Sequence, residues 1–496
     1  MLGHIIRKEI VSNLSSPAFI ATFILCSGLI LLSVYTGLRS YSDQVTEYRL
    51  TQALNRELLG EQKDYRGVGS QGVQLSKPPK VLGIVASGVE NSLGRHTMVN
   101  AYSSDPQPAA SKIEGNPVFA LFGDLDLMFI VKTVLSLLAI LFTYNAISGD
   151  KEDGTLRLTL SHPVPRDTLI LGKIIGGFLC LMIPLAIPIL LGVALITLYP
   201  EAQITGNDWG RLALIMGVFV LYMTLFFNLG IFVSARTRQS STSFLVLLSV
   251  WVVVTLVIPK GSVIVAGQFI QVPSLHEHRI RLNQVRRDIS IKNRPDFRAY
   301  SKENPHPKRP KISKKTPRAE RDQINAEYKK ARDEWRNKQR TWMDDHFTRT
   351  RELWEAEQAK MEQDYRNQQQ SLADLAVVIS RISPASAMTY ATMGLAGTGI
   401  RGQEHFVELA RNYKGQFAEY LQSKGVSRSG IMFSTGDQKK DPPKSVDISD
   451  MPVFQANPEP LSDILGRITI DLILMSVLSL AFFVGTYFSF LRYDVR

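Results

Sequence analysis

The chain has 496 residues, a net charge of +12 and a mean hydropathy of +0.00. This average combines long apolar runs with a very polar middle, which excludes an ordinary soluble globular protein and predicts an α-helical integral membrane protein. The two cysteines, Cys26 and Cys180, fall inside apolar runs, so no disulfide framework is expected.

Six apolar runs are long enough to cross a membrane, because about 20 helical residues span the roughly 30 Å of hydrocarbon. The predicted spans are Pro17–Leu38, Leu125–Ile147, Leu169–Tyr199, Leu212–Ser234, Ser243–Pro259 and Ile464–Leu491. They divide the chain into an interfacial segment (1–16), the first span (17–38), spans two to five (125–259) and the last span with a short tail (464–496). Pro184, Pro188 and Gly192 lie in the third span, which we expect to tilt, kink or break.

Basic residues in the short connections predict the orientation of the chain. They gather on the side that holds both chain ends: Arg7, Lys8, Lys151, Arg157, Arg166, Lys173, Arg236, Arg238, Arg492 and Arg496. The short connection on the other side, residues 200–211, has a single basic residue. We therefore expect both termini in the cytosol and the chain in a bacterial cytoplasmic (inner) membrane, in contact with its lipids.

Two long segments lie on the opposite side. Residues 39–124 predict a small outer loop domain, and residues 260–463 predict a larger, mainly helical extracytoplasmic domain. From Ser274 to Arg340 the chain has 21 Lys and Arg against nine Asp and Glu, which accounts for the whole net charge. Such a block could bind nucleic acid, anionic lipid or an acidic partner, but its predicted position outside the cytosol argues against nucleic acid.

A long helical hairpin is predicted at residues 274–383. Leu282, Val285 and Ile289 step by three and four along its first helix, five prolines follow between residues 295 and 317, and residues 318–383 contain neither Gly nor Pro. Apolar stripes in the second helix consist of Ile324, Tyr328, Ala331, Trp335 and Trp342, and of Phe347, Trp354 and Met361. A helix about 100 Å long is not stable alone in water, so it should pair with the first helix, a second copy or an envelope protein. Residues 385–462 combine an amphipathic stretch with an expected exposed loop at 438–449.

The most informative segment is residues 148–168, between the second and third spans on the side of the chain ends. Charged residues begin it, Leu156, Leu158 and Leu160 give it an apolar edge, and prolines end it. A short amphipathic element at a membrane surface suits contact with a soluble partner.

This segment resembles the cytosolic coupling region of ABC transporter permeases of the type-2 exporter superfamily. Those proteins show Glu, then Gly-Thr-Leu, then Ser-x-Pro-Val-x-Arg, and Gly-Lys in the next span. The matching residues are Glu152, Gly154, Thr155, Leu156, Ser161, Pro163, Val164, Arg166, Gly172 and Lys173. Residues 6–10 are similar to the family's interfacial elbow helix, and residues 116–124 and 381–387 resemble stretches of a subgroup with enlarged extracytoplasmic loops. The long helix from Arg318 departs from smaller members, so their substrates do not carry over.

The resemblance implies that a separate ATPase subunit, which holds ATP and Mg²⁺, presses on this segment. It also implies a second permease protomer, identical or different. The residues implied in ATPase coupling are Lys151, Glu152, Asp153, Gly154, Thr155, Leu156, Ser161, Pro163 and Arg166. Gly154 would allow close backbone approach. The chain itself would then be no enzyme and would hold no cofactor.

Other motifs are weak or absent in the sequence. No Gly-x-x-x-x-Gly-Lys-Ser/Thr phosphate loop, His-Glu-x-x-His pair or paired-cysteine metal pattern occurs. The stretch from Gly397 to Gly402 matches a dinucleotide fingerprint by letter only, because no βαβ pattern surrounds it. His276 and His278 do not share a helix face and are expected to be surface histidines.

Ionisable residues inside spans are functional candidates. Lys132 lies in the second span, and Asp471 lies in the last span, one turn after Arg467. Either Lys132 and Asp471 approach each other, or Lys132 extends to the interface while Asp471 pairs locally with Arg467.

Two functions remain open from the sequence. The chain is the permease of an ATP-driven transporter that exports a substrate or moves a lipid-linked one, or it relays ATPase motion to envelope partners through the long outer helices without translocation. A receptor would need a cytosolic output domain, and a membrane-bound enzyme would need a catalytic site; the sequence indicates neither.

Overall fold

The computed structural model describes residues 2–15, 17–90, 92–100, 106–108, 125–161, 165–311, 317–426 and 446–492. These residues are mainly helical, with one three-stranded sheet. Six helical segments among them are long and apolar enough to cross a membrane: Phe19–Gly60, Leu127–Glu152, Arg166–Leu198, Gly206–Arg236, Ser240–Phe269 and Leu461–Leu491. The predicted α-helical, six-span class is confirmed. The first of these helices continues well beyond the predicted end of the first span at Leu38.

The chain divides into two compact units. Unit 1 contains residues 1–265 and 376–496, and unit 2 contains residues 266–375. Both clusters of buried apolar side chains lie in unit 1.

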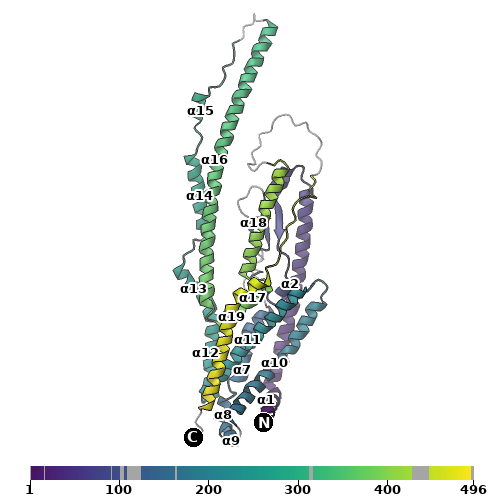
Figure 1. The fold of residues 1–496 in the computed structure, drawn as a ribbon, viewed down its shortest axis with the longest axis vertical. Helices are drawn as coiled ribbons and strands as arrows, with labels where there is room; N and C mark the ends of the chain where they lie inside the picture. The colour runs from purple at the N-terminus through teal and green to yellow at the C-terminus, as the bar shows by residue number, and fades with distance from the viewer. Residues whose placement is uncertain are drawn as a thin grey trace. The chain divides into compact units, whose positions relative to one another are not determined.

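The spans of unit 1 pack around α11 (Gly206–Arg236), which contacts α7, α17 and α19 (Figure 1). Its Tyr222, Phe226 and Phe227 are fully buried, and aromatic rings of this size contribute much of the apolar area that a core removes from its surroundings. The other elements of the bundle are α1 (Leu2–Leu14), α2 (Pro17–Gly60), α6 (Leu127–Phe129), the π-helix η2 (Ile130–Leu135), α7 (Ser136–Thr143), α8 (Ser148–Glu152), α9 (Thr155–Leu160), α10 (Arg166–Leu198), α12 (Ser240–Val252), the π-helix η3 (Val253–Val257), α13 (Ile258–Phe269) and α19 (Leu461–Leu491).

The helices α1, α8 and α9 and the carboxyl end of α19 lie at one end of unit 1, and α18 (Ile400–Ser423) lies at the other end (Figure 1). We call the first of these the terminus end. The third span, α10, runs as one helix although Pro184 and Pro188 lie inside it, so the break that we considered does not occur. Neighbouring helices and local adjustment allow a membrane helix to keep an internal proline.

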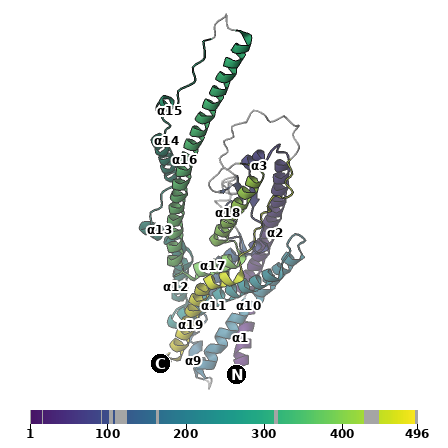
Figure 2. The same ribbon diagram turned by 45° about the horizontal axis from the view of Figure 1, so that its top comes forward.

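A short buried helix, α17 (Pro384–Ala396), also belongs to the span bundle. Ten of its 13 residues are buried, and it contacts α11 and α19 (Figure 2). Small residues allow this packing: a Cβ atom added at Gly394 would lie 3.3 Å from Ile468. Placing all of 260–463 in an outer domain is therefore wrong for this helix, which packs with the spans.

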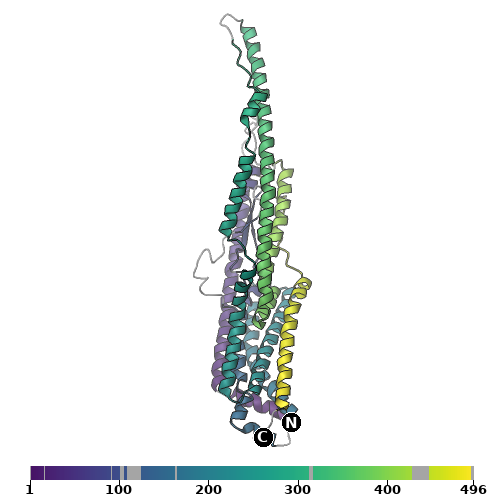
Figure 3. The same cartoon turned by 90° about the vertical axis from the view of Figure 1, so that its left-hand side faces the viewer.

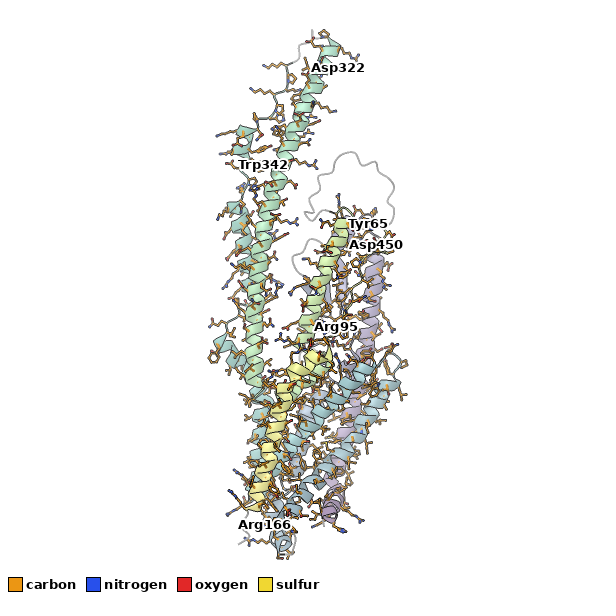
Figure 4. All side chains as sticks on the ribbon, viewed as in Figure 1. Tyr65, Arg95, Arg166, Asp322, Trp342 and Asp450 are labelled. Carbon is orange, nitrogen blue, oxygen red and sulfur yellow. The ribbon has the colours of Figure 1, made fainter. Side chains whose placement is uncertain are left out.

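The two outer segments of unit 1 form one composite domain. It contains the distal part of α2, α3 (Tyr65–Gln71), α18 and an antiparallel sheet in the order β1 (Val73–Ser76), β2 (His96–Val99) and β3 (Gln107–Pro108). The 3₁₀ turn η1 (Val81–Ile84) packs instead into the core of the span bundle. Its core combines Leu75 and Val99 of the sheet with Phe406 and Phe417 of α18. Figure 4 places Tyr65 and Asp450 together at its distal end, where Lys424 lies 2.5 Å from Asp450. The predicted separation of 39–124 from the later segment is thus wrong, because the two share a core.

Unit 2 contains a self-paired helical hairpin. The helix α14 (Leu275–Lys292) begins at a capping box formed by Ser274 and Glu277, and α15 (Phe297–Glu303) follows it. Both lie along α16 (Arg318–Ser380), whose last residues belong to unit 1 (Figure 3). The long uninterrupted second helix is confirmed, and the first helix is the pairing partner that this chain supplies.

Aromatic contacts form the seam of the hairpin. The His278 ring stacks on Tyr365 at 4.1 Å, and the Tyr300 ring stacks on Trp342 at 4.3 Å. His278 is 6% exposed, so its prediction as a surface histidine is wrong, whereas His276 is exposed. Phe347 is 43% exposed and does not belong to the seam.

Candidate functional site

The predicted coupling segment (residues 148–168) contains two short helices, α8 and α9, joined at Gly154 (Figure 1). Gly154 has φ 73°, a left-handed conformation that a residue with a Cβ atom adopts only at a cost. Apart from its two chain neighbours, no atom of the described residues lies within 4 Å of a Cβ added there. Within this chain, glycine is therefore required for backbone conformation and not for close approach.

Two neighbouring charges of α8 bind the two sides of the connection between α11 and α12. The Lys151 ammonium donates to the carbonyl oxygens of Ala235 and Thr237, at the carboxyl end of α11. The Glu152 carboxylate accepts a 3.0 Å hydrogen bond from the Ser240 amide, at the amino end of α12. Each charge is opposite in sign to the dipole end that it meets, so both contacts are favourable.

Lys173 of α10 connects α1, α8 and the turn before α8. Its ammonium lies 2.7 Å from Asp150 of α8 and 3.1 Å from Glu9 of α1, and it donates to the Ala146 carbonyl at 3.1 Å. The α1 helix approaches α10 closely because Gly176 has no side chain: a Cβ atom there would lie 2.9 Å from Glu9 Cβ. The expected elbow helix is thus joined by charge to the coupling segment.

Three more hydrogen bonds complete the attachment. The Ser234 hydroxyl accepts from the amides of Ile147 and Ser148, at 3.0 Å each. Arg166 donates to the Leu491 carbonyl at 2.8 Å, and Figure 4 shows Arg166 at the terminus end. The coupling segment is therefore bonded to α10, α11, α12 and α19, and through Lys173 to α1.

The remaining predicted coupling residues divide into one anchor and an exposed face. Leu156 is 1% exposed and anchors α9 to the core, whereas Leu158 is 67% exposed. The single apolar edge predicted for Leu156, Leu158 and Leu160 is wrong, because residues two apart point to different sides of a helix. Exposed beside Leu158 are Asp153, Gly154, Thr155, Arg157 and Ser161. Pro163 lies outside the described residues, as do residues 116–124 and 438–445.

A family model described as ABC-2 family transporter protein matches residues 4–495. The chain belongs to this family. Two curated relatives are each named probable ABC transporter permease protein NosY. The one from Stutzerimonas stutzeri is 31% identical over 128 residues, which are 25% of this chain and 45% of the relative. The one from Pseudomonas aeruginosa is 34% identical over 125 residues, which are 24% of this chain and 43% of the relative. The chain thus spans less than half the length of the curated relatives it matches.

The intramembrane charges of this ABC-2 family protein pair differently from either expectation. Asp471 is 1% exposed, and its Oδ1 lies 2.8 Å from Arg381 Nε. Arg467 instead lies 2.6 Å from Glu459. Among the described residues no ion pair joins Asp471 to Lys132, so both proposed partners of Asp471 are wrong. The sequence has no clear signal for this partner, because Arg381 lies three residues before α17, a helix that neither length nor period reveals.

Lys132 lies in the π-helix η2, where the backbone is tied to neighbouring spans. Tyr222 donates to the Lys132 carbonyl at 3.0 Å, and the Ser136 hydroxyl donates to it at 2.5 Å. Trp251 of α12 in turn donates to the Ser136 hydroxyl at 2.9 Å. These bonds connect the second, fourth and fifth spans at the π-helix, a feature that is frequent at functional sites.

In the part of the chain that the structure describes, no group of three or more His, Cys, Asp or Glu residues could hold a metal ion. Two glycines of the stretch that matches a dinucleotide fingerprint by letter are required by the fold. Gly397 has φ 71°, and a Cβ atom at Gly402 would lie 2.6 Å from the Gly397 carbonyl oxygen. Both glycines border a small cavity that is described further below.

Proposed function

We propose that this chain is the membrane permease subunit of an ATP-driven ABC transporter and that a separate ATPase subunit docks on α8 and α9 at a cytosolic terminus end. The observation that carries this proposal is the set of bonds from the coupling segment to the ends of the spans. Lys151 and Glu152 bind α11 and α12, and Lys173 and Arg166 extend the connection to α1, α10 and α19.

This arrangement suits the transmission of motion. Transmission requires a contact whose displacement moves other elements between two arrangements. A push on α9 reaches α8 through Gly154, and α8 cannot move without carrying the ends of α11 and α12 or losing its charge-assisted hydrogen bonds. The exposed face around Leu158 is available for the partner, which would hold ATP and Mg²⁺.

The transported substrate would be exported or moved while linked to a lipid, and a second permease protomer, identical or different, would complete the pathway. The name of the NosY relatives agrees with a permease role. The matched part of those relatives is less than half their length, so their own cargo is not carried over.

The test uses the chain purified from its native membrane in mild detergent. A subunit that crosslinks to photoreactive ATP should copurify with the wild type and be lost with Leu158→Glu, because that change places a charge at the centre of the docking face. The matched control is Val453→Glu, another exposed apolar residue of unit 1 at 75% exposure. Thermal unfolding should be unchanged in both variants. Retention of the ATP-binding subunit by Leu158→Glu, or its absence from the wild type, would refute the proposal.

A second function, relay of ATPase motion without translocation, is favoured by the end of α16. Directly after α16, Arg381 pairs with Asp471 of the last span, and Ser383 donates to the Val254 carbonyl of the fifth span at 2.5 Å. The end of the long helix is therefore bonded to two spans, as a lever would require.

Shortening the hairpin distinguishes the transporter function from the relay function. The His278 and Tyr365 rings are in contact, so replacing residues 280–363 with a short Gly-Ser linker removes the distal hairpin and joins two neighbouring points of unit 2. Under the transporter proposal, ATP-driven uptake or release of cargo in vesicles decreases. Under the relay proposal, ATPase activity is unchanged and neither the wild type nor the variant shows ATP-driven flux, while the loss of the distal hairpin abolishes the cellular effect.

A further inference from the structure

A cavity of about 210 Å³ lies in unit 1, between the composite domain and the first turns of two spans. Lys80, Arg211, Gly397 and Glu459 contribute to its lining, and Ile464 marks the start of α19 there. The cavity is smaller than the roughly 300–1,000 Å³ typical of sites for drug-sized ligands. It can hold a compact polar group, but not a whole lipid or peptide.

Two cations of this cavity have backbone partners and no acidic one. Lys80 donates to the Gly397 carbonyl at 2.9 Å, and Arg211 donates to the Glu459 carbonyl at 2.7 Å. Arg211 is 4% exposed, and its Nε has no hydrogen-bond partner. Among the described residues, no carboxylate lies within ion-pair distance of either cation. A buried charge without a counter-ion is costly, so an anion here would relieve the cost.

The nearby acids are already paired with other cations. Glu90 lies 3.4 Å from Lys77, and Glu459 lies 2.6 Å from Arg467. Arg95, which Figure 4 labels, adds a further positive charge and donates to the Lys77 carbonyl at 3.1 Å. The region therefore has more positive than negative charge, and the cavity is where the excess is located.

The pKa of Lys80 is lowered in this positively charged region. Burial, together with the positive charges of Lys77 and Arg211, lowers the pKa of Lys80 to about 8 despite the opposing effect of Glu90 and Glu459. The α18 helix begins at Ile400 beside the cavity, which adds the positive end of a helix dipole. A Cβ atom at Gly397 would overlap the Lys80 ammonium, so this glycine leaves room for the cation.

We propose that this cavity binds a phosphate group, held by the Lys80 ammonium and the Arg211 guanidinium. A guanidinium offers paired N–H donors that match phosphate oxygens, and an ammonium adds a compact charge. Two sources provide this chemistry: inorganic phosphate, and the phosphodiester of a lipid headgroup. The second source is sterically reasonable because Arg211 and Ile464 lie near the ends of apolar spans. The proposal does not depend on the coupling of α8 and α9 to an ATPase.

The first experiment measures binding with the full-length chain. Inorganic phosphate should raise the midpoint of thermal unfolding in detergent more than chloride at equal ionic strength. In nanodiscs, native mass spectrometry should show phosphatidylglycerol retained after delipidation if the source is a headgroup. Lys80→Gln should weaken either interaction by about tenfold or more, as expected for the loss of a charge-assisted hydrogen bond. Lys80→Arg should keep it, and Lys63→Gln, which removes the same charge from an exposed position, should have no effect.

Each outcome decides the proposal. An effect of phosphate alone identifies a free anion, and retention of phosphatidylglycerol alone identifies a headgroup. If neither probe binds, or if Lys80→Gln binds as the wild type does, the proposal is wrong.

A second measurement needs no variant and so does not depend on the folding of Lys80→Gln. The lowered pKa makes the amine of Lys80 reactive towards acylating reagents near pH 8. Bound phosphate, or bound phosphatidylglycerol, should slow its acylation relative to Lys63 when peptides are quantified by mass spectrometry. Equal acylation rates with and without both ligands would also overturn the proposal.

Discussion

The two units are secured by different kinds of side-chain contact. In unit 1, charges meet helix ends or each other at the edge of a large apolar core, as Lys151, Glu152 and Asp471 show. In unit 2, four of the described residues are buried, namely Ala266, His278, Tyr300 and Tyr365. Charges at helix ends and in ion pairs thus secure unit 1 around its apolar core, whereas aromatic stacking forms the narrow seam of unit 2.

This difference predicts unequal local stability. A bundle with a continuous core unfolds cooperatively, whereas a hairpin with few buried contacts opens locally at a lower free-energy cost. Stability in unit 1 should therefore depend on single buried groups, and stability in unit 2 on single aromatic contacts, with little transfer of the effect between the units.

The largest effect is expected from Asp471→Asn. The change leaves the Arg381 charge without its counter-ion at a site where Asp471 is 1% exposed. Breaking a buried pair costs about 3–5 kcal/mol, and the partial exposure of Arg381 favours the lower value. The free energy of unfolding in micelles, measured with denaturant, gives the cost.

A double variant tests the physical reason for that cost. Arg381→Met with Asp471→Leu replaces the pair by apolar side chains and should recover most of the stability, because no buried charge is then left alone. If the double variant is as unstable as Asp471→Asn, the loss comes from packing and not from charge. Asp463→Asn, on the exposed first turn of the same helix, is the control.

The next largest effect is expected from Trp342→Ala in unit 2. The change removes the stacking on Tyr300 and the edge contact with Phe297. Truncation of a fully buried Trp costs about 3–5 kcal/mol, so a half-buried one should cost about 2 kcal/mol. Hydrogen exchange should accelerate in α14 and α15 and remain unchanged in unit 1. Phe347→Ala, at an exposed position of the same helix, should change little; faster exchange across α11 in Trp342→Ala would contradict the separation of the units.

The sequence predicts long, periodic elements of both units well. Six apolar runs identified the spans, and the absence of Gly and Pro after Arg318 identified α16, because both signals extend over many residues. It does not predict α17, since a 13-residue stretch of small residues has neither the length of a span nor a strong period. The composite domain was missed because its core joins residues more than 300 positions apart.

For single residues of the candidate site, the sequence likewise predicts less than the fold determines. The family motif identified Glu152, Gly154 and Arg166, but Ser240 is an ordinary serine until the fold brings its amide to Glu152. Leu158 was assigned to the wrong side because the leucine alternation has the period of a strand, whereas the segment is helical. Motifs therefore indicate which residues matter, and tertiary packing determines what each one contacts.

The smallest effect on stability is expected from Gly154→Ala. This variant measures the cost of a backbone conformation separately from the cost of altered packing. Its φ of 73° costs a residue with a Cβ atom about 1–2 kcal/mol, and no described residue beyond its chain neighbours comes close enough to add to that cost. Gly466→Ala in α19 is the matched control, because that glycine is helical, also has open space around it, and should gain up to about 1 kcal/mol. Under the proposed function, the permease should stimulate its partner ATPase less in Gly154→Ala and normally in Gly466→Ala. Since the strain lies at the joint between α8 and α9, a stable Gly154→Ala protein with unchanged ATPase stimulation would show that α9 does not transmit motion through this joint.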